Sequence, residues 1–211
     1  MKTFSRLGGA LAMAAGAAIT LGSGAAGAQM VNFQGSTDGC FGIACTPAST
    51  ATLAGLTFTD STFDVDTAAG FVSIGDAPGN PNNFNNLGSF KLLGSPFVYN
   101  GNDFELTVSF SAPAGTTPGS SVFTSDLVGT VGPTNNGGVF INFDNTPKVF
   151  SYDGGTFSFF VNDVSLVRGG NVAVTGVITT QVSAIPEPET YALMMAGLAA
   201  VGFMSRRRKK A

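Results

Sequence analysis

Short runs of alternating apolar and polar residues fill the chain from Gln29 to Ile185, and they restrict what it can fold into. The clearest run is Phe104–Phe110, in which every second side chain is apolar. This period of two buries one face of a β-strand and leaves the other face in water. No helix signals interrupt the region, and clusters of Gly, Asn, Asp and Pro separate the runs. The pattern therefore predicts an all-β body of antiparallel strands.

About nine or ten strands are expected at a spacing of about 10–12 residues, which is typical of an antiparallel β-sandwich or a jelly roll. The phenylalanines are the expected core, and all eight prolines of the body fall between the runs, where a sheet tolerates them. In one run the alternation changes phase near Phe160, which indicates a bulge or burial on both faces. Besides Phe104–Phe110, the runs are Leu53–Thr59, Phe63–Val65, Phe71–Ile74, Leu87–Leu93, Val122–Val131, Val139–Phe143, Lys148–Tyr152, Thr156–Leu166 and Val172–Val182.

Residues 1–28 are typical of a secretory signal peptide, read by the general secretion machinery. The parts are a basic start (Lys2 and Arg6), an apolar run (Leu7–Leu21) and a small-x-small cleavage site (Ala26 and Ala28). Cleavage there makes Gln29 the mature N-terminus. The alternative is an uncleaved membrane anchor, but the apolar run is short and Gly-rich and ends in a cleavage pattern.

Residues 186–211 form a second segment that is not part of the predicted body. The parts are a Pro-Glu-Pro motif (Pro186, Glu187 and Pro188), an apolar run (Tyr191–Met204) and a basic cluster (Arg206, Arg207, Arg208, Lys209 and Lys210). Proline suits the first turn of a helix, and cations suit its C-terminal end and the cytoplasmic side of a membrane. As a helix, the 14-residue run spans about 21 Å, short of the ~30 Å hydrocarbon core. We therefore expect a transmembrane helix that holds the tail only transiently.

This three-part tail resembles the PEP-CTERM sorting signal. The resemblance implies that an exosortase, an integral-membrane enzyme, cuts near Pro186–Pro188 and passes the protein to the cell surface or to another anchor. It also implies a Gram-negative bacterium that makes exopolysaccharide. The alternative is an ordinary single-pass anchor in which the Pro-Glu-Pro triplet is accidental.

The body between Gln29 and Ile185 is acidic, with eleven Asp and Glu against three basic residues, a net charge of −8. Such a body should repel nucleic acid and anionic membrane surfaces. The chain also has no histidine. That excludes Ser-His and Cys-His catalytic pairs and histidine-bound metals.

Cys40 and Cys45 are the only cysteines. Export places them in an oxidising compartment, and an even count favours one structural disulfide. The alternative is a metal or redox pair, which the spacing of four intervening residues disfavours.

Several carboxylates invite a functional interpretation. Asp103 and Glu105 share one face of a predicted strand, about 7 Å apart, a separation that glycoside hydrolysis uses. Asp60, Asp64 and Asp66 could offer oxygen ligands to calcium. Solvated acids on an open sheet face explain both groups more simply, so no catalytic, metal or cofactor site is expected.

Glycan contact is the remaining possibility. Tyr99 and Tyr152 are the tyrosines of the body, and Asn80–Asn86 offers amides that could bind sugar hydroxyls or satisfy the loop's own backbone. We expect a non-enzymatic cell-surface or extracellular-matrix protein, structural or adhesive, associated with exopolysaccharide or biofilm. The alternative is a carbohydrate-binding module for the cell's own exopolysaccharide, and an enzyme is not expected.

Overall fold

The computed structural model describes residues 30–78, 84–93, 96–134, 136–182 and 193–199. Within these ranges the body is built from fifteen strands. They are β1 (Asn32–Phe41), β2 (Thr50–Leu53), β3 (Leu56–Thr59), β4 (Thr62–Asp66), β5 (Phe71–Ile74), β6 (Ser89–Leu92), β7 (Phe97–Val98), β8 (Asn102–Ala112), β9 (Ser120–Val131), β10 (Gly137–Phe143), β11 (Lys148–Tyr152), β12 (Gly155–Val161), β13 (Val164–Val167), β14 (Asn171–Ala173) and β15 (Gly176–Val182).

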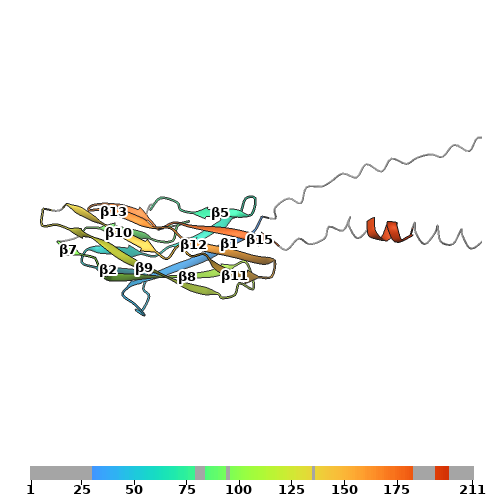
Figure 1. The fold of residues 1–211 in the computed structure, drawn as a ribbon, viewed down its shortest axis with the longest axis horizontal. Coiled ribbons are helices and arrows are strands. Elements are labelled where there is room, and N and C mark those ends of the chain that lie inside the picture. Colours follow the sequence, from blue (N-terminus) through green and yellow to red (C-terminus); the bar gives the residue numbers. More distant parts are fainter. Residues whose placement is uncertain (1–29, 79–83, 94–95, 135, 183–192, 200–211) are drawn as a thin grey trace, which may run out of the picture.

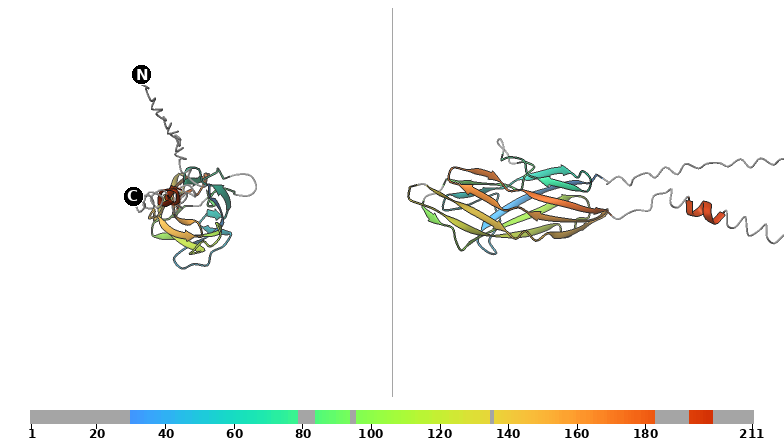
Figure 2. Two further views of the ribbon diagram at one scale, coloured as in Figure 1. Left: turned by 90° about the vertical axis from the view of Figure 1, so that its right-hand side faces the viewer. Right: turned by 45° about the horizontal axis from the view of Figure 1, so that its top comes forward.

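The strands form three antiparallel sheets around one core (Figures 1 and 2). A large curled sheet has the order β13-β10-β9-β8-β1-β4, with β7 paired to β9. The β12 sheet has the order β11-β12-β15-β5, and the β6 sheet has the order β14-β6-β3-β2. The prediction of an antiparallel all-β body is confirmed. The arrangement is a curled half-barrel with two smaller sheets packed on the same core, not the expected sandwich or jelly roll, and it has fifteen described strands in place of nine or ten.

Phenylalanine rings hold the three sheets together. Phe104, on β8 of the large sheet, lies 5.0 Å from the ring of Phe58 and 4.9 Å from that of Phe90, both in the β6 sheet. Six residues further along β8, Phe110 lies 5.1 Å from the rings of Phe150 and Phe157 in the β12 sheet. The expected phenylalanine core is therefore confirmed, and β8 links both small sheets to the large one.

Strand β1 lies between β8 and β4, yet the sequence did not predict it. Its segment is polar and glycine-rich, so it lacks apolar alternation. The reason is packing, because the inner face of β1 is covered by rings from other strands. A Cβ at Gly35 would lie 2.4 Å from the Phe63 ring, and one at Gly39 would lie 2.5 Å from the Phe104 ring. Glycine is required where those rings lie.

Two other expectations about strands are wrong. The predicted run Leu53–Thr59 contains a turn at Ala54 and Gly55, both with positive φ, which divides it into β2 and β3. The phase change near Phe160 is neither a bulge nor two-sided burial. β12 ends at Val161 and β13 starts at Val164 in a different sheet, so the buried positions shift between them.

The terminal segments contribute little described structure. A helix covers residues 193–199 with exposed side chains. Among the described residues, no helix has both the length and the apolar character needed to cross a membrane. The predicted signal peptide with Ala26 and Ala28, the motif Pro186–Pro188 and the cluster Arg206–Lys210 all lie outside the described residues.

Substitution of Gly35 and Gly39 on β1 tests whether the core rings need the space that these glycines leave. We expect Gly35→Ala and Gly39→Ala each to lower the free energy of unfolding by about 1–3 kcal/mol, because the new methyl group displaces a core ring or a backbone carbonyl. Gly119→Ala is the matched control, since its nearest neighbouring atom would be 4.0 Å from the new Cβ. Urea denaturation measures all three, and equal losses in the control and the β1 variants would contradict this account.

Candidate functional site

The disulfide lies on the outer face of the large sheet. Cys40 is bonded to Cys45, with 5.9 Å between their Cα atoms, so the expected disulfide is confirmed. The carboxylate of Glu105, opposite Cys40 on β8, accepts a hydrogen bond of 3.0 Å from the Ala44 amide inside the closed loop. The Gly42 amide donates to the Asp103 carbonyl at 2.9 Å. Both sulfurs are used by the disulfide, so the pair does not offer the thiolates that a metal needs.

Asp103 and Glu105 do share one face, as predicted, on either side of the buried Phe104. Their surroundings differ. Glu105 fixes the disulfide loop, whereas Asp103 lies directly opposite Asp126 on β9. No described pocket is lined by both carboxylates. The geometry gives Glu105 a structural role.

The three aspartates considered as calcium ligands, Asp60, Asp64 and Asp66, have different surroundings. The Asn32 amide donates to the Asp64 and Asp66 carboxylates at 2.8 and 3.0 Å, and the Gln34 amide donates to Asp64 at 3.2 Å. Burial, and then the negative charge of Asp38, raises the pKa of Asp60. Among the described residues, the only group of three acidic or cysteine side chains close enough for one ion is Cys40, Cys45 and Glu105.

The described part of the asparagine-rich loop binds its own backbone. Asn85 has a φ of 54° and accepts a hydrogen bond of 2.9 Å from the Asp64 amide. Asn86 is fully buried, donates to the Asp76 carbonyl at 3.2 Å and accepts from the Gly88 amide at 2.9 Å. Of the two interpretations of Asn80–Asn86, these contacts favour a loop that satisfies its own backbone.

The two body tyrosines have opposite environments. Tyr99 is fully buried, and its hydroxyl donates to the Ala54 carbonyl at 2.9 Å. Tyr99 therefore belongs to the core, where burial raises its pKa, and its suggested role in glycan contact is wrong. The hydroxyl of Tyr152 is shielded from solvent but has no hydrogen-bond partner. An unsatisfied buried hydroxyl costs about 1–3 kcal/mol.

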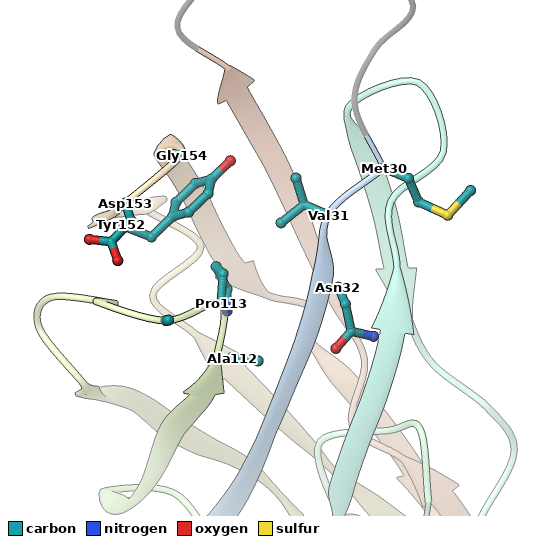
Figure 3. A pocket seen from close by; sticks show the side chains of 9 residues that line it. Met30, Val31, Asn32, Ala112, Pro113, Tyr152, Asp153 and Gly154 are labelled. Atoms are coloured by element: carbon teal, nitrogen blue, oxygen red, sulfur yellow. The ribbon is translucent and has the colours of Figure 1, made fainter.

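Tyr152 lines a pocket of about 390 Å³ (Figure 3). Its ring stands between Gly154 and Val31, with Pro113 nearby, and the remaining lining is mostly small or apolar. Asp153 is the only charged residue of the lining. The pocket therefore offers an aromatic face and few polar groups, and its lining holds no nucleophile with an adjacent base.

Both chain ends leave the body beside this pocket. Met30, just before β1, and Gly154, in the β11–β12 turn, line it together. Val182, the last residue of β15, pairs with Gly155 of the same turn. Figure 1 shows the start of β1 and the end of β15 at this one pole of the elongated body.

Comparison with known proteins bears on the segment that follows β15. Residues 184–209 match the family model of the PEP-CTERM protein-sorting motif. No curated protein and no solved structure gives a significant match. The match includes the Pro-Glu-Pro motif and most of the basic cluster, and it supports an exported protein sorted by an exosortase, a membrane enzyme. The signal implies delivery to the cell envelope or surface.

Removing the hydroxyl of Tyr99 or of Tyr152 should affect the stability of the body differently. Tyr99→Phe deletes a formed hydrogen bond and leaves the Ala54 carbonyl unpaired, so we expect a loss of about 0.5–1.5 kcal/mol. Tyr152→Phe removes an unpartnered hydroxyl, so we expect unchanged or higher stability. Chemical denaturation compares the two, and an equal loss in Tyr152→Phe would show that its hydroxyl has a partner in solution.

Proposed function

We propose that this chain is the precursor of a non-catalytic structural or adhesive protein of the cell surface or extracellular matrix, associated with exopolysaccharide or biofilm. The observation that carries the proposal is the PEP-CTERM motif at residues 184–209. A protein with this signal is exported, and its body then acts outside the inner membrane.

The processing follows the order of the chain. The signal peptide at residues 1–28 directs export through the general secretion machinery. The apolar run 191–204 holds the tail in the inner membrane, with Arg206–Lys210 on the cytoplasmic side. Exosortase cleaves near Pro186–Pro188 and frees a body that begins at Gln29. The start of β1 and the end of β15 lie at the same pole, which suits a domain tethered near its cleavage site.

The properties of the body support a matrix role. Its net charge of −8 favours solubility and disfavours binding to nucleic acid or anionic lipid. The disulfide and the phenylalanine core suit a protein that must persist outside the cell.

Carbohydrate binding is the second candidate, and the Tyr152 pocket favours it. An aromatic ring, the Pro113 ring and the Asp153 carboxylate are groups that can contact the apolar face and the hydroxyls of a neutral sugar. Titration of the cell's own exopolysaccharide tests this candidate. Saturable binding that Tyr152→Ala abolishes and Tyr99→Phe retains would support it.

Intact mass of the protein recovered from cells tests the sorting proposal. We expect a mass lacking both ends, and we expect a variant with Pro186, Glu187 and Pro188 all changed to Ala to keep its tail in the membrane fraction. The double variant Glu189→Ala, Thr190→Ala is the matched control and should be processed normally, because the triplet is intact. A native protein that retains Arg206–Lys210 would contradict exosortase processing.

A further inference from the structure

The disulfide and the Glu105 carboxylate form one compact cluster on the outer face of the large sheet. The two sulfurs and a carboxylate oxygen of Glu105 all lie within 4.8 Å of one another. Cys40 and Glu105 are directly opposite each other on β1 and β8, and the Glu105 oxygen Oε2 lies 4.0 Å from the Cys45 sulfur. While the disulfide is intact, the sulfurs bind each other and the cluster has a single anionic group.

Glu105 is held in this position by contacts that do not involve the sulfurs. Its oxygen Oε1 accepts the hydrogen bond of 3.0 Å from the Ala44 amide, and its other oxygen, Oε2, is the one that faces Cys45. On β8, Glu105 stands between the buried Phe104 and Leu106, which fix the strand beneath it. Metal-binding carboxylates are oriented in the same way, by a hydrogen bond to the oxygen that does not bind the metal.

Reduction of the disulfide should leave the body folded. Cys40 and Cys45 are only five positions apart, and a short closed loop contributes less stability than a long one. The sheets are held together by phenylalanine contacts in which no cysteine takes part. The Gly42 amide also bonds the Asp103 carbonyl at 2.9 Å, so the opened loop stays beside Glu105.

The reduced cluster has the ligand types and the spacing that a zinc ion needs. Tetrahedral Zn²⁺ binds sulfur at ~2.3 Å and a carboxylate oxygen at ~2.0 Å, which places these two ligand atoms about 3.5 Å apart. The 4.0 Å between the Cys45 sulfur and Glu105 Oε2 is therefore only about 0.5 Å too long. Two sulfur ligands favour Zn²⁺ over Ca²⁺ and Mg²⁺, which bind oxygen.

Charge makes the cation necessary. Two thiolates and one carboxylate this close together repel one another, so the thiols of the reduced protein keep their protons when no metal is present. A divalent cation displaces these protons and offsets the negative charge.

We propose that the disulfide closes a redox-controlled metal site, in which the reduced protein binds one Zn²⁺ through the sulfurs of Cys40 and Cys45 and the Oε2 atom of Glu105. Three protein ligands leave the fourth position of the tetrahedron to water. The inference goes beyond the proposed function. It does not depend on processing of the tail, because all three ligands lie in the body.

Thiol–disulfide exchange opens the site. Cys45 is partly exposed, whereas Cys40 is 5% exposed, so a low-molecular-weight thiol attacks the Cys45 sulfur and Cys40 leaves as the thiolate. A second thiol then attacks the first one in the mixed disulfide, and Cys45 is released. The two small thiols leave as their own disulfide, so two electrons and two protons pass to the protein. Zn²⁺ then releases the two protons to solvent.

Titration of the protein recovered from cells with Zn²⁺, before and after reduction, tests the inference. A phosphine is the reductant, because it adds no thiol that competes for the metal, and a thiol reagent verifies that both cysteines are free. We expect one Zn²⁺ per reduced chain with release of about two protons, and binding at least about 100-fold weaker in the oxidised protein. Co²⁺ in place of Zn²⁺ should give the visible absorption of a tetrahedral thiolate site.

Matched variants identify the third ligand. Glu105→Gln keeps an acceptor for the Ala44 amide but loses the anionic oxygen, so we expect zinc binding to weaken at least about tenfold. Asp103→Asn is the matched control, because it removes one negative charge from the same face of β8 and Asp103 is not part of the cluster. Binding in this control should stay within about twofold of the unmodified protein. Thermal unfolding of each reduced variant verifies that it is folded.

Three results would overturn the inference. The first is a reduced protein, with both thiols free, that binds Zn²⁺ no more tightly than the oxidised protein does. The second is Glu105→Gln binding as tightly as Asp103→Asn. The third is unfolding of the body on reduction, which would make the disulfide a structural cross-link only. Intact mass separates all three from failure of the sorting proposal, because it reports removal of the two ends.

Discussion

Burial of phenylalanine rings between three sheets is the interaction on which the rest of the structure depends. The inward residues of β8 contact the β6 sheet through Phe104 and the β12 sheet through Phe110. A single sheet layer does not cover its own apolar face, so each four-stranded sheet buries that face against the large sheet. The rings also impose glycine on β1, where Gly35 and Gly39 leave room for Phe63 and Phe104.

Many polar side chains on the outer face make hydrogen bonds that stabilise the body. The side-chain amides of Asn32 and Gln34 donate hydrogen bonds to the carboxylates of Asp64 and Asp66. Glu105 accepts a hydrogen bond from the disulfide loop and so fixes it. Asn86 satisfies backbone groups of its own loop, and Asn85 accepts a hydrogen bond from the Asp64 amide on β4. Glu105, Asp64 and Asp66 are thus held by structural hydrogen bonds.

The body has two different poles. One carries the start of β1, the end of β15 and the Tyr152 pocket, and the other carries the exposed side chains of Val98 and Val167. The two ends of this small domain therefore present different surfaces.

By itself, the sequence determined the antiparallel all-β class, the disulfide and the C-terminal sorting motif. These depend on local signals: alternation of side chains, cysteine number with an export signal, and a contiguous motif. Only the tertiary structure decided that polar, glycine-rich Asn32–Phe41 is a strand between β8 and β4, and that the phase change after Phe160 is a passage between sheets. It also decided that Tyr99 is core and that Glu105 lies opposite Cys40. These features arise from pairing between residues far apart in the chain, which a local pattern does not record.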